Sequence, residues 1–223
     1  MIKLENISKS FNKNKNPLII FNELNFEIQT GKFVSILGRS GSGKTTILNI
    51  IGGILKADSG NVYVNDINIS NMTDDELADY RNQKIGFVFQ KYLLEPSLTV
   101  IDNVVMPLVI RGTNRLEREE KAREVLSFLD LEDRINEKVE NLSGGEQQRV
   151  SIARALIGDP DIILADEPTG NLDYERGQEV LDYLKKISLN GKSIILVTHS
   201  KDDAYKYSDI IYEITNGKIT KSN

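Results

Sequence analysis

The feature that most constrains the fold is a glycine-rich segment at residues 38–46, which reads GRSGSGKTT. It follows the apolar run FVSIL and leads into TTILNIIGGIL, so a strand, a glycine turn and a helix are expected in succession. The segment satisfies the spacing G-x-x-x-x-G-K-[ST]. In such a turn backbone N–H groups point at a phosphate and the lysine reaches its outer oxygens. We therefore predict a phosphate loop, since the flanking strand and helix argue against a merely flexible glycine turn.

Every residue of this loop is a candidate nucleotide contact. Lys44 is also a candidate catalytic residue, because its ammonium can reach the β and γ oxygens of a nucleotide. The hydroxyl of Thr45 is a candidate Mg²⁺ ligand. The candidate contacts are Gly38, Arg39, Ser40, Gly41, Ser42, Gly43, Lys44, Thr45 and Thr46.

Composition narrows the class of protein. A length of 223 residues suits one large α/β domain or a domain with an inserted subdomain, and the absence of cysteine argues against a disulfide-framed secreted module. A formal charge of −5 makes nucleic acid an unexpected main partner. The N-terminal MIKLENISKSF lacks the apolar core of a signal peptide, and no apolar stretch approaches the roughly 18 residues that span a bilayer. Any membrane role is therefore expected to depend on a partner.

Short apolar runs alternate with helical patterns along most of the chain. This alternation predicts a mostly parallel sheet with crossover helices. The runs at 162–165 and 194–197 are apolar at successive residues, so they are expected to be central strands. A polar segment at 11–17, FNKNKNP, is expected to form a loop. The predicted strands are KFVSIL, NVYVN, KIGFVF, DIILAD, KSIILVT and DIIYEI.

Residues 91–158 contain no strand signal and are predicted to form an inserted helical subdomain. At 115–131 the apolar residues fall on one helical face, and the pairs Glu117–Lys121 and Glu119–Arg123 are spaced for ion pairs on the other. We expect one domain over 1–223, with 1–90 and 159–223 forming the α/β core. In the stretch 97–112, Asp102 and Pro107 are expected to prevent a long buried helix.

Two carboxylates follow the apolar strand in DIILADEP at 161–168. Successive side chains of a strand point to opposite faces, so Asp166 and Glu167 are expected to have different roles. In a phosphate-loop enzyme the strand-terminal aspartate holds Mg²⁺, here through water, and the next glutamate polarises the attacking water. We assign Asp166 to the metal and Glu167 to general-base catalysis; a solvated pair of acids is the alternative.

Two further polar residues follow predicted strands at the same end of the sheet. His199, the only histidine, comes directly after SIILVT, and Gln90 closes KIGFVF. His199 is a candidate for holding the γ-phosphate and the attacking water, and Gln90 for contacting Mg²⁺ or that water. The alternatives are a packed or surface histidine and an ordinary exposed glutamine.

A second loop with the character of an anion site lies at 142–149, LSGGEQQR. Two glycines followed by helix formers predict a loop that opens onto a helix N-terminus. With the phosphate loop, Gln90, this octapeptide, IILADEP, GNLD at 170–173 and TH at 198–199 in this order, the chain resembles the nucleotide-binding subunit of ATP-binding cassette (ABC) transporters over essentially its whole length.

The resemblance implies a fold and a set of partners. The fold is α/β, a phosphate-loop NTPase core with a mostly parallel sheet, an antiparallel β portion near the N-terminus and the helical insertion. It implies ATP and Mg²⁺ as cofactors, Phe11 under the adenine, and Asp173 at a contact between two copies; a core phenylalanine is the alternative at Phe11. The octapeptide would face ATP bound to the second copy through its residues Ser143, Gly144, Gly145 and Glu146.

Within the family, the sequences FVFQKYLLEPSLTVIDNVVMPLVIRG and ILADEPTGNLD resemble the ATPases of macrolide efflux, lipoprotein release, cell division and antimicrobial-peptide transport. Membership implies a permease on a separate chain, a place on the cytoplasmic face of the membrane, and export of a hydrophobic, lipidated or peptide substrate. Transmembrane signalling in place of transport is the alternative. A soluble ABC protein acting on nucleic acid or ribosomes is disfavoured by one phosphate loop in 223 residues and by the acidic balance. Tyr92 and Leu93 are candidate permease contacts.

Overall fold

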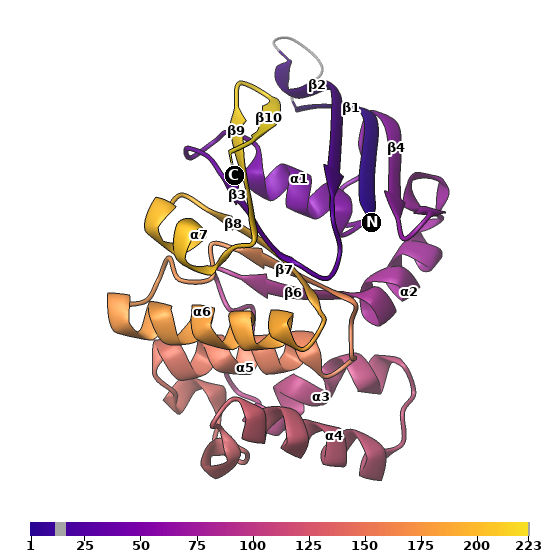
Figure 1. Cartoon of the computed structure of the whole chain (residues 1–223). Helices are drawn as coiled ribbons and strands as arrows, with labels where there is room; N and C mark the ends of the chain where they lie inside the picture. Colours follow the sequence, from indigo (N-terminus) through magenta and orange to yellow (C-terminus); the bar gives the residue numbers. More distant parts are fainter. Residues whose placement is uncertain (12–16, 223) are drawn as a thin grey trace.

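The structure is a computed structural model that describes residues 1–11 and 17–222 (Figure 1). The expected polar loop at 11–17 falls for the most part on residues 12–16, outside the described residues. The strands are β1 (Ile2–Phe11), β2 (Leu18–Ile28), β3 (Phe33–Leu37), β4 (Ser59–Val64), β5 (Ile67–Asn68), β6 (Ile85–Phe89), β7 (Ile162–Asp166), β8 (Ser193–Thr198), β9 (Ile210–Thr215) and β10 (Lys218–Lys221). The α-helices are α1 (Lys44–Ile51), α2 (Asp74–Lys84), α3 (Val100–Ile110), α4 (Arg115–Phe128), α5 (Gly144–Leu156), α6 (Tyr174–Leu189) and α7 (Lys201–Tyr207). Short 3₁₀ turns are η1 (Ile69–Asn71), η2 (Glu132–Arg134) and η3 (Val139–Asn141).

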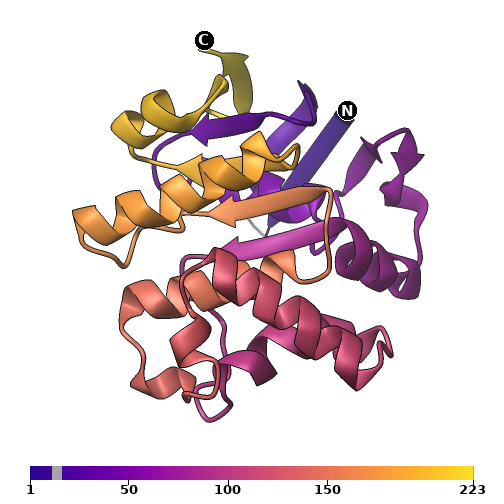
Figure 2. The same cartoon turned by 60° about the horizontal axis from the view of Figure 1, so that its bottom comes forward.

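The described strands form two sheets. The larger has the order β10-β9-β3-β8-β7-β6, in which β10 is antiparallel to β9 and the other neighbours are parallel. The smaller, β2-β1-β4-β5, is antiparallel and comes from the N-terminal part of the chain. The predicted α/β fold with a mostly parallel sheet and an antiparallel portion is confirmed. The runs predicted to be central strands, now β7 and β8, are buried and lie inside the larger sheet (Figure 2).

Apolar side chains of the parallel strands alternate between two cores. On β3, Phe33 belongs to the core shared with α3, α4, α5 and α6, whereas the next residue, Val34, belongs to the core shared with α1 and the antiparallel sheet. Their parallel partners on β8 follow the same alternation, Ile194 with Phe33 and Ile195 with Val34. The larger sheet therefore separates α1 from α5, as Figure 1 shows.

Helices α3, α4 and α5 occupy the segment that was predicted to be helical. Helix α3 is 11 residues long, and Thr99 caps its first turn. It contains both Asp102 and Pro107, and it is not buried along its whole length, since Val109 and Ile110 are exposed. A proline removes one backbone hydrogen-bond donor from a helix. The buried side chains of Val104 and Leu108 pack this helix against the core and offset that loss. The boundaries of a helical subdomain at 91 and 158 remain a prediction.

One of the two ion pairs expected on α4 forms. Lys121 lies 2.8 Å from Glu117, as predicted. Glu119 instead pairs with Arg115, 2.6 Å away, and the prediction of a Glu119–Arg123 pair is wrong. Glu119 has an arginine one turn away in each direction, and i,i+4 spacing alone does not choose between them.

Candidate functional site

The phosphate loop connects β3 to α1. Gly43 stands before the helix with φ +100, a left-handed conformation that favours glycine, and lets Lys44 begin α1. The ammonium of Lys44 is buried and donates to the carbonyl oxygens of Gly38 and Arg39, at 2.9 and 3.2 Å. The loop thus closes around the lysine side chain, as a phosphate loop requires.

The end of β7 brings the two carboxylates to this loop. Thr45 donates its hydroxyl hydrogen to Asp166 over 3.1 Å, and the Lys44 ammonium lies 3.3 Å from a Glu167 carboxylate oxygen. Both acids therefore contact consecutive residues of α1. Strand alternation does not apply to them, because the strand ends at Asp166 and Glu167 has φ +44, which turns its side chain out of the strand pattern.

The single histidine completes this group of side chains. His199 follows β8, the neighbour of β7 in the sheet, and its Nδ1 lies 3.0 Å from the second carboxylate oxygen of Glu167. The His199 side chain is 68% exposed and that of Glu167 is 22% exposed, so the imidazole extends over the carboxylate toward solvent. Lys44, Glu167 and His199, which are far apart in the sequence, meet at the C-terminal ends of parallel strands.

Burial changes the acidity of Asp166. Removal from water raises the pKa of its carboxyl above the usual range, and the neighbouring Glu167 charge adds to this rise. The hydrogen bond from Thr45 acts in the opposite direction. A carboxylate that is poorly solvated in this way gains from a nearby cation.

Gln90 lies next to the loop that follows Glu167. The Asn171 side-chain amide donates to the backbone carbonyl of Gln90 over 2.8 Å. A Cβ added to Gly170 would come within 2.6 Å of the Gln90 side-chain nitrogen, so Gln90 packs on this glycine. Sequence patterns gave no indication of this contact between Asn171 and Gln90. The two residues are 81 positions apart, and no local pattern connects them.

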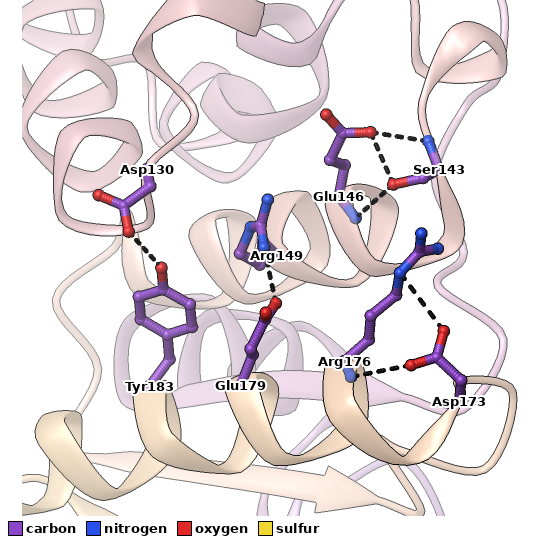
Figure 3. Close-up of polar contacts among 8 residues, drawn as sticks. All are labelled: Asp130, Ser143, Glu146, Arg149, Asp173, Arg176, Glu179 and Tyr183. Carbon is purple, nitrogen blue, oxygen red and sulfur yellow. Dashed lines mark hydrogen bonds and ion pairs between the residues drawn. The ribbon is translucent and has the colours of Figure 1, made fainter.

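The octapeptide 142–149 forms the start of α5 (Figure 3). Ser143 is its N-cap: its hydroxyl accepts from the Glu146 backbone N–H, and the Glu146 carboxylate accepts from the Ser143 backbone N–H at 2.8 Å and hydroxyl at 2.7 Å. These bonds hold the pKa of the Glu146 carboxyl below its usual range, and Arg134, 3.3 Å away, contributes to this. The predicted loop and helix N-terminus are both present.

Gly145 lies against the start of α6. A Cβ added to Gly145 would stand 3.2 Å from the Arg176 side chain, a distance that the long arginine can relieve by a small shift. Arg176 lies 3.4 Å from the Asp173 carboxylate, and Asp173 caps α6 by accepting from the Arg176 backbone N–H (Figure 3). The octapeptide and the GNLD segment thus lie side by side, a proximity that the sequence analysis did not predict.

A cleft of about 1100 Å³ opens beside the phosphate loop. Its walls come from the start of β2, residues 38–42 of the loop, and the turn between β9 and β10. Phe11 is not among the described residues that line it. It ends β1, pairs with Leu18 of β2 and is 38% exposed, so the alternative of a core phenylalanine is wrong, and adenine stacking on Phe11 remains a prediction.

The chemistry of the residues present fits a nucleotide phosphate with Mg²⁺. A Cβ at Gly38 would lie 2.4 Å from the Ile214 side chain, so only glycine keeps the loop in this path. The buried hydroxyl of Ser42 has no hydrogen-bond partner among residues 1–11 and 17–222, which suits an incoming phosphate oxygen. The hydroxyl of Thr45 and the carboxylate of Asp166 are hard oxygen donors, the kind that Mg²⁺ binds beside phosphate.

A glycine loop between β3 and α1, with carboxylates at the end of the nearby strand β7, defines a phosphate-loop nucleoside triphosphatase. The family model for ABC transporters matches residues 21–170. The chain belongs to the ABC transporter family and is an ATPase domain of that family.

The chain is similar to proteins of bacteria and archaea. It is 43% identical over 219 residues to the macrolide export ATP-binding/permease protein MacB of Vibrio parahaemolyticus. The aligned residues make up 98% of this chain and 33% of MacB. It thus spans about a third of the length of the macrolide-export relatives it matches. It is 44% identical over 226 residues to the uncharacterized ABC transporter ATP-binding protein MJ0796 of Methanocaldococcus jannaschii, covering 99% of this chain and 96% of the relative.

Solved structures of that archaeal protein share the fold. A dimeric post-hydrolysis state of MJ0796 bound to ADP and Pi superimposes with a TM-score of 0.89 at 41% identity, over 100% of this chain and 99% of the other. A second dimeric structure of MJ0796 superimposes with the same TM-score at 42% identity and the same coverage. Along residues 1–11 and 17–222 of the present chain, no helix combines the length and the apolar character needed to cross a membrane.

Proposed function

We propose that the chain hydrolyses ATP in a head-to-tail dimer with a second copy of itself and thereby drives a membrane permease. The observation that carries this proposal is the meeting of Lys44 and His199 on the two carboxylate oxygens of Glu167, at 3.3 and 3.0 Å. A base held between a phosphate-binding ammonium and an imidazole is placed to act on water beside the terminal phosphate.

Each residue near this base has a distinct task in the proposed reaction. Glu167 accepts the proton of the attacking water, His199 orients Glu167 and contacts the γ-phosphate, and Lys44 turns from the carbonyls of its own loop toward the phosphate oxygens. Mg²⁺, when bound, neutralises the charge that develops on the phosphates. Thr45, Asp166 through water and Gln90 are the residues proposed to hold it.

The octapeptide is proposed to act on ATP bound to the second copy. Helices α1 and α5 pack on opposite faces of the larger sheet, so the donors at the start of α5 are not part of their own chain's phosphate loop. Ser143, Gly144 and Gly145 would supply a hydroxyl and N–H groups to the partner's γ-phosphate, with Glu146 next to them. Asp173, which begins α6 beside them, would contact the second copy. The dimeric structures of MJ0796 support this assembly.

The proposed permease is a separate chain, and its contact lies just after Gln90. Leu93 is 60% exposed there, while Tyr92 is half-buried beside α5. Export or removal of a hydrophobic, lipidated or peptide substrate is proposed from the similarity to MacB, which is named for macrolide export. The chain would then work at the cytoplasmic face of the membrane.

The test of the dimer is Gly145→Asp, made in a Glu167→Gln background that retains ATP. A carboxylate at this position adds a negative charge beside the N–H groups proposed to bind the partner's phosphate. It is expected to abolish ATP-driven dimerisation, measured by light scattering, while the monomer still binds ATP. Gly145→Ala is the matched control: it adds the same Cβ near Arg176 without the charge, and should dimerise. Normal dimerisation of the aspartate variant would refute the placement of the octapeptide in the second site.

A further inference from the structure

Helix α5 holds the segment that follows β6 at several points. We name residues 89–93, from Phe89 to Leu93, the Gln90 segment. The guanidinium of Arg154 donates to the carbonyl oxygen of Tyr92 at 2.9 Å and to that of Leu93 at 2.5 Å. The Gln148 amide donates to the carbonyl of Phe89 at 3.5 Å. The reaction proposed above uses neither of these α5 side chains.

The environment of Arg154 shows that these bonds are not incidental. Arg154 is partly buried, and its removal from water lowers the pKa of the guanidinium. Across residues 1–11 and 17–222 no carboxylate forms an ion pair with Arg154, so the backbone carbonyls of Tyr92 and Leu93 compensate its desolvation. One of them belongs to Leu93, whose φ of +52 is unusual for leucine. The two hydrogen bonds of the Arg154 guanidinium therefore stabilise a backbone shape that the local sequence does not favour.

Burial of the Gln148 side chain also costs free energy, because one of its polar atoms has no partner. Its side chain is fully buried, and its Oε1 has no hydrogen-bond partner among the described residues. A buried amide that is half satisfied destabilises a fold relative to an apolar side chain of similar shape. A gain in stability therefore does not explain the glutamine at position 148. Its hydrogen bond to the carbonyl of Phe89, the residue before Gln90, does explain it.

The backbones of α5 and β6 approach each other closely at Gly86. A Cβ on Gly86 would lie 2.5 Å from the backbone oxygen of Ala155, so the helix backbone rests directly on the strand. On its other side the Gln90 backbone is held by Asn171, in the loop that follows Glu167. The Gln90 segment is thus held between α5 and the loop that follows Glu167.

We infer that Arg154, assisted by Gln148, is a positioning residue that fixes Gln90 to the helix whose N-terminus carries the octapeptide. The consequence for the reaction rests on the proposed function of Gln90. A displacement of α5 by the second copy's ATP would be passed through Arg154 to the Gln90 segment, which includes Tyr92 and Leu93, the residues proposed to face the permease.

The test compares Arg154→Lys with Arg111→Lys. Lysine keeps the charge but cannot span two carbonyls as the planar guanidinium does. Arg111 is the matched control, because it too donates to two backbone carbonyls, those of Asn82 and Gly158, away from the Gln90 segment. For Arg154→Lys we expect amide hydrogen exchange of residues 90–94 to accelerate by about tenfold or more, and kcat to fall by about tenfold with KM for ATP within about threefold. Arg111→Lys should change neither the exchange at these residues nor kcat.

A second variant separates the loss of positioning from a general loss of stability. Gln148→Leu removes the unsatisfied amide and is expected to be at least as stable as the wild type, yet to accelerate exchange at residues 90–94. The inference is overturned if exchange at the Gln90 segment is unchanged in Arg154→Lys, or if Arg111→Lys lowers kcat to the same degree. Normal turnover by Glu167→Gln would contradict the proposed function instead, and the exchange measurement on Arg154→Lys would still decide the positioning role.

Discussion

At the scale of single residues, Glu167 occupies the most constrained position in the site. Its left-handed backbone follows a buried strand, and its two carboxylate oxygens face Lys44 and His199. Strain of this kind persists only where the surrounding structure enforces it, and here the Glu167 backbone N–H donates to the Val197 carbonyl at 3.0 Å. The geometry places one carboxylate between an ammonium and an imidazole.

We predict that Glu167→Gln retains ATP but loses turnover. The amide keeps the shape and hydrogen bonds of the side chain but cannot accept a proton, so kcat should fall by about 10²–10⁴. Lys44→Ala should act differently, because it removes the phosphate-binding ammonium and weakens ATP binding itself. Equilibrium binding of ATP and steady-state phosphate release separate the two effects. Turnover at the wild-type rate in Glu167→Gln would show that another group is the base.

Glu146 provides a prediction about pH. Bonds from Ser143 lower the pKa of Glu146 in the folded chain below the ordinary value of 4.5, so its contribution to stability is present above that value and is lost as the pH falls through the folded pKa. The stability difference between the wild type and Glu146→Gln should therefore be largest near neutral pH and decrease on acidification. Urea unfolding of both proteins at several pH values measures this. A difference that is constant with pH would contradict the cap.

At the scale of elements, polar contacts join α6 to α5 and to the residues that follow α4 (Figure 3). The Tyr183 hydroxyl donates to Asp130, after α4, at 2.5 Å, and Glu179 lies 3.4 Å from Arg149 of α5. The apolar contact of α6 with these helices has no directional preference, so these polar bonds help to define how they are aligned.

We predict that Tyr183→Phe destabilises the fold by about 1–2 kcal/mol, because a hydrogen bond to a charged acceptor is lost at a buried ring. Burial also raises the pKa of Tyr183 to about 12, helped by the Asp130 carboxylate, so the hydroxyl remains a donor at neutral pH. Denaturant unfolding measures the effect. Tyr205→Phe is the control, since this ring is 56% exposed and its hydroxyl should contribute little. Equal stability of the two variants would show that the Tyr183 bond does not contribute.

At the scale of the whole molecule, the larger sheet divides the chain into two sides. The phosphate loop and its helix belong to one side, and the octapeptide and its helix to the other. A chain organised in this way presents half of each proposed site. Two copies related head to tail would complete both sites.

We predict that ATPase activity per molecule depends on protein concentration. If each site needs the octapeptide of a second copy, dilution into the monomeric range should lower the specific activity steeply. The measurement is phosphate release over a dilution series, with the oligomeric state recorded in parallel by light scattering. A constant specific activity in samples that are monomeric throughout the reaction would show that one chain is sufficient.

Much of the site was predictable from local sequence. The phosphate loop, the carboxylates after β7 and the helix N-terminus at 142–149 depend on glycine spacing, an apolar strand and a run of helix-forming residues, all of which act over a few residues. The contact between Lys44 and Glu167 could be anticipated only in outline, from the rule that parallel strands present their C-terminal ends at one edge. Its geometry depends on the left-handed turn at Glu167, which strand alternation does not predict.

The sequence by itself determined the parallel strands, the helical segment, the phosphate loop and the family, because these follow from local patterns and from motifs in a set order. The tertiary structure alone decided which distant residues meet: Asn171 and Gln90, Arg154 and the Gln90 segment, Arg176 and Gly145. The physical reason is that such contacts depend on how helices pack on a sheet across many intervening residues. Burial then sets their strength, and a side chain's burial is a property of the assembled fold.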